Sequence, residues 1–256
     1  MLIIRNWAML PQVLRHASQK LTQYGQTLLP LSCLLCQQGV TAGVICPTCV
    51  ADLEQSYCHC LRCGLPLPST QTQCGHCLAH QPNFERLYAC GLFRPPLNQV
   101  VFQLKYAKQP LFANILGQML ANQVKQQLPA SQSLPELLVP VPLHAKKERQ
   151  RGFNQAQLIA QHCGQQLNIP VNTTAVKRIK NTQSQTQLTR QQRQQNMHRA
   201  FKQMTALQGI SHLAIVDDIV TTGATANSLS QVLKQAGVKK IDIWCVCRTA
   251  NRPKSS

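Results

Sequence analysis

The stretch Leu213-Ala-Ile-Val-Asp-Asp-Ile-Val-Thr-Thr-Gly-Ala-Thr225 decides the fold of this chain, because an apolar run there delivers two adjacent aspartates into a loop of small, hydroxylated residues. The chain has only eight acidic residues, so two side by side indicate a site. Removing an unpaired carboxylate from water costs several kcal/mol, and such a pair therefore needs water, metal or hydroxyl partners. We interpret the stretch as a site for a phosphorylated sugar.

The loop that follows the aspartates is suited to a phosphate. Gly223 can take a backbone conformation that is closed to other residues, and the N-terminus of the next helix presents free N–H groups and the positive end of its dipole. The backbone of Ala224 lies at this N-terminus, and hydroxyl groups add further donors at Thr221, Thr222 and Thr225.

Asp217 and Asp218 are placed to accept hydrogen bonds from the two ring hydroxyls of a ribose, or to hold magnesium through water. The simpler alternative is a polar strand-to-helix turn in which Thr225 is the N-cap. That alternative explains the threonines but not the paired aspartates.

The second part of the chain alternates helices and strands, which predicts an α/β fold with a parallel sheet flanked by helices. Periodicity predicts helices over 97–106, 111–128, 154–167 and 225–235. Apolar runs predict strands over 137–141, 213–216 and 241–246. Ligands of such folds bind at the carboxyl ends of the strands, where Asp217 and Asp218 fall.

Eight of the thirteen cysteines form four Cys-x-x-Cys pairs, and this arrangement predicts two structural zinc sites. The stretch is too poor in large apolar residues to fold by burial alone. The first set is Cys33, Cys36, Cys46 and Cys49, and the second is Cys60, Cys63, Cys74 and Cys77. Cys58, His59 and His76 are close enough in sequence to substitute in the second set. We expect Cys90, Cys163, Cys245 and Cys247 to be buried apolar residues.

The chain is strongly basic, with 26 Lys and Arg residues against 8 acids and a net charge of +18. Much of this charge lies between His144 and Lys202, which favours nucleic acid as a partner and phosphate-rich metabolites second. Candidate nucleic-acid contacts are Arg151, Lys177, Arg178, Arg190 and Arg193. Phe153 and Phe201 either stack on bases or pack in the core. The Gln-rich segment 181–195 is either a mobile loop or a solvated helix. We expect no signal peptide and no membrane span, and a cytoplasmic protein.

The segment Val216-Asp-Asp-Ile-Val-Thr-Thr-Gly-Ala-Thr225 resembles the motif that binds 5-phosphoribosyl-1-pyrophosphate, or PRPP, in type I phosphoribosyltransferases. Two further segments narrow the resemblance: Leu138 to His144 followed by Arg151-Gly-Phe-Asn-Gln155, and Gln187-Leu-Thr-Arg190 followed by Arg193 and Asn196. Together with the cysteine pairs, they are similar to the ComF/GntX family of competence and DNA-utilisation proteins.

Apolar periodicity predicts a helix in the N-terminal segment 1–30, and the change of sequence character after Pro82 predicts a domain boundary there. The resemblance implies a double zinc ribbon over 31–81 and a type I phosphoribosyltransferase-like domain over 82–256. It implies action on incoming single-stranded DNA during natural transformation, with a helicase or translocase as a partner. The alternatives are an active phosphoribosyltransferase that makes nucleotides and a zinc-dependent adaptor with a vestigial pocket.

The resemblance also implies roles for individual residues. PRPP with magnesium would occupy the aspartate-threonine loop, and Asp217 and Asp218 would be the catalytic pair. Arg190 and Arg193 would belong to a mobile hood that closes over the substrate. Phosphate or pyrophosphate contacts would come from Lys105, His144, Lys146, Arg149 and Arg151.

Overall fold

The computed structural model of this 256-residue chain describes residues 31–40, 45–53, 56–106, 109–179 and 200–250. The chain divides into two compact units, 1–52 and 53–256. The expected N-terminal helix over 1–30 and the Gln-rich segment 181–195 lie outside the described residues. Within the described ranges, every helix is too short or too polar to span a membrane.

The first unit contains the first cysteine set. A short antiparallel pair joins β1 (Leu31–Ser32) to β2 (Gly39–Val40). Helix α2 (Pro47–Leu53) begins directly after Cys46 and carries Cys49 in its first turn. These are small elements with few apolar side chains. Their fold therefore depends on what the four thiols bind.

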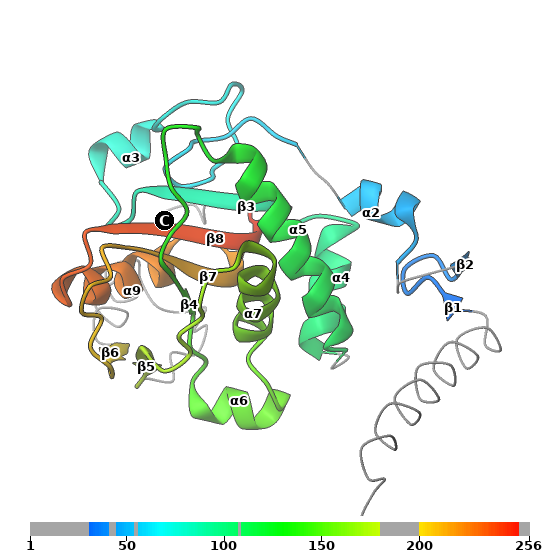
Figure 1. The fold of residues 1–256 in the computed structure, drawn as a ribbon. Coiled ribbons are helices and arrows are strands. Elements are labelled where there is room, and N and C mark those ends of the chain that lie inside the picture. Colours follow the sequence, from blue (N-terminus) through cyan, green and yellow to red (C-terminus); the bar gives the residue numbers. More distant parts are fainter. Residues whose placement is uncertain (1–30, 41–44, 54–55, 107–108, 180–199, 251–256) are drawn as a thin grey trace, which may run out of the picture. The chain divides into compact units, whose positions relative to one another are not determined.

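The second unit is built on a four-stranded parallel sheet with the order β3-β8-β7-β4 (Figure 1). The central strands are long and almost wholly buried, as expected when helices cover both faces of a parallel sheet. Ile215 of β7 pairs with Ile243 of β8 on one side and with Val139 of β4 on the other. The strands span Arg86–Leu92 (β3), Leu137–Pro140 (β4), His212–Val220 (β7) and Lys240–Arg248 (β8).

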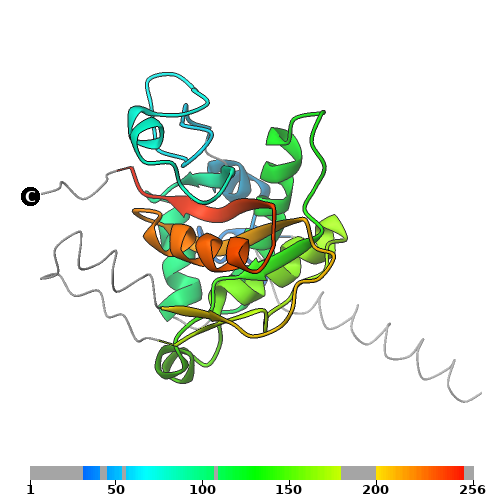
Figure 2. The ribbon, with the colours of Figure 1, turned by 90° about the vertical axis from the view of Figure 1, so that its left-hand side faces the viewer.

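Helices lie on both faces of this sheet (Figure 1). Ile215 and Ile243 pack toward α9 (Ala224–Gln235), which Figure 2 shows lying along the sheet. A two-stranded hairpin of β5 (Val176–Arg178) and β6 (Phe201–Gln203) completes this side. The helices on the opposite side are α4 (Leu97–Tyr106), α5 (Leu111–Gln127) and α7 (Gln155–Leu167).

The close packing of α5 against α7 depends on Gly117. A Cβ atom at this position would lie 2.9 Å from the carbonyl oxygen of Ile159 and 2.6 Å from the Cβ of His162. Any larger residue would therefore push the two helices apart, which explains a glycine in the middle of a helix despite its low helix propensity.

The second cysteine set belongs to the second unit, where it is tied to the sheet. Leu87 of β3 donates a backbone hydrogen bond to Leu61, which lies between two of the cysteines. Arg62 forms an ion pair of 3.0 Å with Glu85, which is also paired with Lys234 of α9. Helix α3 (Gly75–Ala79) carries the last cysteine of the set. The boundary between the two compact units therefore lies between the two cysteine sets. The sequence suggested a boundary at Pro82.

The predicted α/β fold is confirmed, and most predicted elements are present within one or two residues of their expected ends. The helix over 97–106 is confirmed at both ends. The strands over 213–216 and 241–246 were predicted too short, since both continue to the edge of the sheet. Strand β3, helix α6 (Ala145–Arg151) and the β5–β6 hairpin were not predicted.

Candidate phosphate and metal sites

The paired aspartates lie inside strand β7 and not in a loop after it, so the expectation that the strand ends at Val216 was wrong. Strand β8 continues beside β7, with Asp217 opposite Cys245. Strand β4 stops at Pro140, which pairs with Val216. The aspartates therefore lie in the part of β7 that extends beyond the end of β4. This part is at the carboxyl edge of the sheet, where ligands bind in such folds.

The loop after β7 turns sharply into helix α9. Gly223 is the N-cap, and its φ of 80° lies in the left-handed region that favours glycine. No side chain caps the helix at this residue, and the Thr222 hydroxyl accepts a hydrogen bond of 3.3 Å from the amide of Ala224. The alternative with Thr225 as N-cap was wrong, because Thr225 lies in the first turn of α9. The threonine hydroxyls and the first amides of α9 are together at a partly exposed turn.

Asp218 forms a close ion pair with Lys105 of helix α4. The distance between Lys105 Nζ and Asp218 Oδ2 is 2.8 Å, and only 14% and 10% of the two side chains are exposed. The sequence analysis predicted that Lys105 contacts a phosphate group of the ligand. The structure brings it to the aspartate pair, where its charge offsets that of Asp218.

Asp217 has a different environment from its neighbour. Burial, followed by the negative charge of Asp218, raises its pKa to about 8, although Lys105 acts in the opposite direction. One of its oxygens accepts a hydrogen bond of 2.9 Å from the backbone N–H of Asp218. Burial and the neighbouring charge therefore favour the neutral acid form of Asp217.

Four basic side chains from three elements lie near one another and the aspartates: Lys105 of α4, Lys147 and Arg151 of α6, and Arg178 of β5. Burial lowers the pKa of Lys147, and the positive charges of Arg178, Arg151 and Lys105 lower it further. Burial also lowers the pKa of Arg178, against the opposing effect of Asp217. Such mutual repulsion is costly in a protein without a ligand, and an anion that binds between these groups would relieve it.

Lys147 is a site residue that the sequence analysis missed. Helix α6 begins after His144, whose ring nitrogen accepts a hydrogen bond of 3.2 Å from the Lys146 amide. Lys147 and Arg151 are one helical turn apart and both are partly buried, whereas Lys146 and Arg149 are exposed on the other side. If helix α6 had been predicted, its period of about 3.6 residues would have placed Lys147 and Arg151 on one face and Lys146 and Arg149 on another.

The segment Arg151-Gly-Phe-Asn-Gln155 connects α6 to α7 and sets the direction of both helices. Gly152 ends α6 with a φ of 84°. Asn154 caps α7 by accepting a hydrogen bond from the Ala156 amide, and its amide group donates to the Val141 carbonyl at 3.0 Å. The cap thus fixes the basic face of α6 beside the end of β4.

Of the expected nucleic-acid contacts, Lys177 is exposed and Arg178 is partly buried with its guanidinium 5.6 Å from the ring centre of Phe201. Phe201 is buried in the core, so its packing alternative is confirmed, and Phe153 is partly buried. Arg190 and Arg193 lie outside the described residues.

A buried arginine connects the second cysteine set to the phosphate loop. Arg248, at the end of β8, is only 1% exposed. Its Nε donates to the carbonyl of Cys63 at 2.9 Å, and its Nη1 donates to the carbonyls of Val220 and Thr221. The same Nη1 also donates to the carbonyl of Thr249 at 2.9 Å. The two ends of one guanidinium group therefore hold two regions that are far apart in sequence.

Each cysteine set is arranged as a four-thiolate metal site. The four sulfurs of each set lie within 4.8 Å of one another. Closest approaches are 3.7 Å between Cys36 and Cys46 and 3.8 Å between Cys63 and Cys74. A tetrahedral zinc with Zn–S bonds of about 2.3 Å requires sulfurs about 3.8 Å apart. The residues present therefore fit zinc in both sets.

Backbone amides support the thiolate form in these sites. The Sγ of Cys33 accepts hydrogen bonds from the amides of Leu35 and Cys46, each at 3.4 Å. Burial raises the pKa of Cys33, but hydrogen bonds from the amides of Cys36, Cys46 and Leu35 together outweigh it and lower the pKa to about 6. In the second set, the Cys74 amide donates to the Cys60 sulfur at 3.2 Å. Such donors orient the ligands and stabilise their negative charge.

The candidates for substitution in the second set are not needed for a complete set. Cys58 is exposed, and a ring nitrogen of His59 lies 2.8 Å from the Tyr57 carbonyl. All four remaining cysteines are buried as expected: Cys90, Cys163, Cys245 and Cys247.

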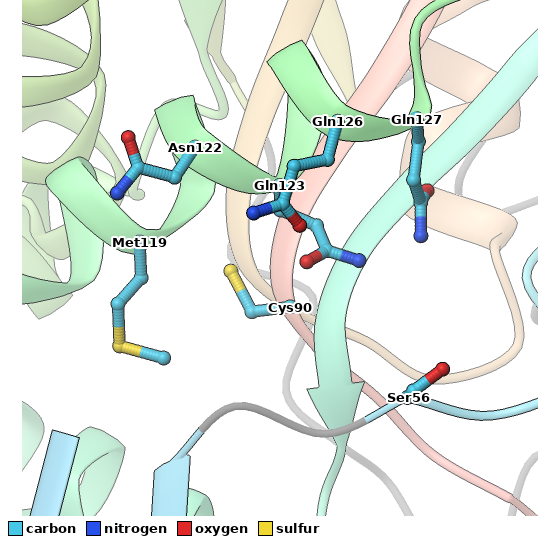
Figure 3. A pocket seen from close by; sticks show the side chains of 7 residues that line it. All are labelled: Ser56, Cys90, Met119, Asn122, Gln123, Gln126 and Gln127. Atoms are coloured by element: carbon cyan, nitrogen blue, oxygen red, sulfur yellow. The ribbon is translucent and has the colours of Figure 1, made fainter. Parts of the chain in front are cut away.

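A separate cavity of about 300 Å³ lies beside α5 and β3 (Figure 3). Its lining is mainly neutral, with Ser56, Cys90, Met119, Asn122, Gln123, Gln126 and Gln127. Burial raises the pKa of the Cys90 thiol well above its usual value, so this group stays uncharged. The cavity offers no charge for a phosphate and is not the site formed by Asp217 and Asp218.

Comparison with known proteins identifies both parts of the chain. Residues 25–78 match the double zinc ribbon domain, and residues 152–256 match the phosphoribosyl transferase domain. The chain therefore combines two four-cysteine zinc-binding sites with a phosphoribosyltransferase domain. Partial likenesses exist to the purine phosphoribosyltransferase from Pyrococcus horikoshii, at 20% identity and a TM-score of 0.30 over 54% of this chain and 76% of that one. Another is to adenine phosphoribosyltransferase from Leishmania tarentolae, at 14% identity and a TM-score of 0.31 over 54% and 56%.

Relatives with similar sequences extend over most of the chain. DNA utilization protein YhgH from Salmonella typhimurium is 34% identical over 227 residues, which is 86% of this chain and 98% of that protein. Competence protein F from Haemophilus influenzae is 31% identical over 221 residues, covering 84% of this chain and 96% of that protein. This chain belongs to the family of these DNA utilization and competence proteins.

Proposed function

We propose that the protein handles single-stranded DNA in the cytoplasm during competence or DNA utilization, and that its transferase-type site binds PRPP or a nucleotide together with magnesium. The observation that supports this most strongly is the meeting of three features at one edge of the sheet. They are the aspartate pair on β7, the turn at Gly223, and the basic side chains Lys147 and Arg178.

These features match the parts of a phosphorylated ribose. A 5-phosphate suits the threonine loop and the first amides of α9, because that turn offers several N–H and O–H donors. Ribose hydroxyls suit Asp217 and Asp218, which accept hydrogen bonds. A pyrophosphate suits the cationic groups of Lys147, Arg151 and Arg178, which now repel one another.

Magnesium would be held on the ligand side of the aspartates, directly or through water. Carboxylate oxygens are the groups that magnesium prefers in proteins. When bound, it would neutralise charge on the leaving pyrophosphate. Asp218 is already paired with Lys105. Binding would therefore require Asp218 to exchange the lysine for magnesium or a ribose hydroxyl.

The names of the relatives favour DNA handling over nucleotide synthesis, and the +18 charge supports a polyanionic partner. A helicase or translocase of the uptake machinery would be a suitable protein partner. The second candidate is an active phosphoribosyltransferase that uses PRPP to make a nucleotide. The complete aspartate-threonine loop favours it, whereas two zinc ribbons are not needed for that reaction.

Calorimetric titration of the zinc-loaded protein with PRPP tests the ligand. We expect binding that requires magnesium and is absent when the same titration is made in magnesium-free buffer. Binding of neither PRPP nor a nucleotide, with magnesium present, would contradict the proposal. Incubation with PRPP, magnesium and a panel of free bases then separates the two candidates, since pyrophosphate release with one base would indicate the enzyme.

Replacing Lys147 by Met should weaken PRPP binding about tenfold or more, because a charge-assisted contact to pyrophosphate is lost. Replacing Lys146 by Met is the matched control, since this neighbour makes the same change of charge on the exposed side of α6. Equal affinities of the two variants would show that pyrophosphate does not bind on the Lys147 face. The same titration measures both variants.

A further inference from the structure

Three aromatic side chains form a continuous row, two of them on helix α4 and one in the segment between β3 and α4. Phe93 follows strand β3, and its ring centre lies 5.6 Å from that of Phe102. Tyr106 lies one helical turn beyond Phe102, with ring centres 5.8 Å apart. The guanidinium of Arg151 is 5.7 Å from the centre of the Tyr106 ring. We call Phe93, Phe102 and Tyr106 the aromatic row.

The aromatic row is much more exposed than the core requires. Phe102 is 44% exposed and Tyr106 is 66% exposed, whereas the other face of α4 is fully buried through Val101 and Leu104. The helix would therefore pack as well with polar residues in place of these rings. Adjacent exposed rings are an uncommon arrangement on a protein surface and indicate a binding function.

The row ends beside the aspartate pair. Tyr106 is adjacent in sequence to Lys105, whose amine contacts Asp218. Arg151, which covers Tyr106, also belongs to the group of basic side chains that repels Lys147. Aromatic rings and cations therefore lie together at one end of the row, and the phosphate site begins there.

We propose that the aromatic row is a base-stacking site for single-stranded DNA, which leads the strand toward the phosphate site. This inference rests on the proposed function and specifies how DNA is held. Bases would stack on the rings, and phosphates would follow Arg151 and the neighbouring cations. Single-stranded DNA is favoured over a protein partner because exposed rings lie beside cations in a chain with a net charge of +18, and this combination suits both the bases and the phosphates of a single strand.

The test compares two oligonucleotides of equal length and charge by fluorescence anisotropy: oligo(dT) and an abasic strand that has no bases. Zinc-loaded wild type should bind oligo(dT) at least tenfold more tightly than the abasic strand. Phe102→Ala and Tyr106→Ala should each weaken oligo(dT) binding about tenfold and leave abasic binding unchanged. Tyr106→Trp keeps an aromatic ring at this position, so it should bind oligo(dT) at least as tightly as the wild-type protein does.

Salt dependence separates stacking from charge. The aromatic variants should lower affinity at every salt concentration without changing the slope of log K against log[salt]. Arg151→Gln should reduce that slope by about one. Leu111→Ala is the control, because Leu111 is 58% exposed at the start of α5 and is not part of the row.

Several results would overturn the inference. If the wild-type protein bound both strands with equal affinity, base stacking would be excluded, although DNA binding itself would stand. The same would follow if the double Phe102→Ala/Tyr106→Ala variant bound oligo(dT) as tightly as the wild-type protein does. No binding of either strand would remove both the row and the DNA part of the proposed function. If sedimentation showed that the double variant turns a dimer into a monomer with unchanged DNA affinity, the row would be a contact between copies of this chain.

Discussion

Replacing Asp217 by Asn should make the ligand-free protein more stable near pH 8 and should also weaken magnesium-dependent binding of PRPP. The pKa of Asp217 is raised to about 8 in the folded protein, against about 4 in an unfolded chain. The folded protein therefore retains a proton that the unfolded chain releases between these values, and stability falls as the pH rises from 4 to 8. Asparagine does not titrate, so the variant does not lose this stability.

The expected gain is on the order of 1–3 kcal/mol at pH 8 and should vanish toward pH 4. Urea unfolding of both proteins at several pH values measures it. Asp218→Asn should have the opposite effect, because it leaves the amine of Lys105 mostly buried without its charged partner. A stability difference between wild type and Asp217→Asn that does not change with pH would contradict the raised pKa.

Both substitutions should weaken PRPP binding about tenfold to a hundredfold each, since an amide is a poor magnesium ligand and a weaker acceptor for ribose hydroxyls. Asp52→Asn is the matched control, because Asp52 is exposed on α2. Oligonucleotide binding should remain. In a transformation or DNA-use assay, full activity of the Asp217→Asn/Asp218→Asn variant would show that the pocket is vestigial.

The aspartate-threonine loop and the cysteine pairs were predictable because local sequence determines them. A Cys-x-x-Cys turn directs two sulfurs to one centre wherever it occurs, and the first amides of a helix are available to anions by geometry alone. The same is true of the helix over 97–106, whose apolar period is clear. These features require no knowledge of distant contacts.

The remaining parts of the site depend on contacts between residues that are distant in sequence. Nothing near Lys105 indicates that it pairs with Asp218, and nothing near Arg248 indicates that it contacts Cys63. Strand β3 was missed because a tyrosine, a cysteine and a glycine interrupt its aliphatic residues. Helix α6 was missed because it is polar all round and has no buried residue.

Replacing Arg248 by Met should lower the free energy of unfolding by about 3–5 kcal/mol, since several buried carbonyls lose their donor at once. Arg248 belongs to none of the ion pairs in the part of the chain that the structure describes. A zinc ion with four thiolates carries a net charge of −2, and the second set would therefore supply the negative charge near this guanidinium. Loss of Arg248 should in turn destabilise the loaded set.

The measurements are the rate of zinc release to a chromogenic chelator and the affinity for PRPP. Arg248→Met should release zinc from the second set faster and should bind PRPP more weakly, because the carbonyls of Val220 and Thr221 no longer have a fixed position. Arg248→Lys keeps the charge but cannot reach both Cys63 and the loop, so it should recover stability in part and affinity hardly at all.

Arg62→Met is the matched control for this prediction. It removes another arginine that connects the second cysteine set to the sheet, through Glu85, without a contact to the phosphate loop. Its PRPP affinity should match wild type. If Arg248→Met and Arg62→Met had the same zinc release and the same affinity, Arg248 would be an ordinary buried residue. If only Arg248→Met changes both, the second zinc site and the phosphate loop are coupled, and by linkage bound PRPP should slow zinc release from the wild-type protein.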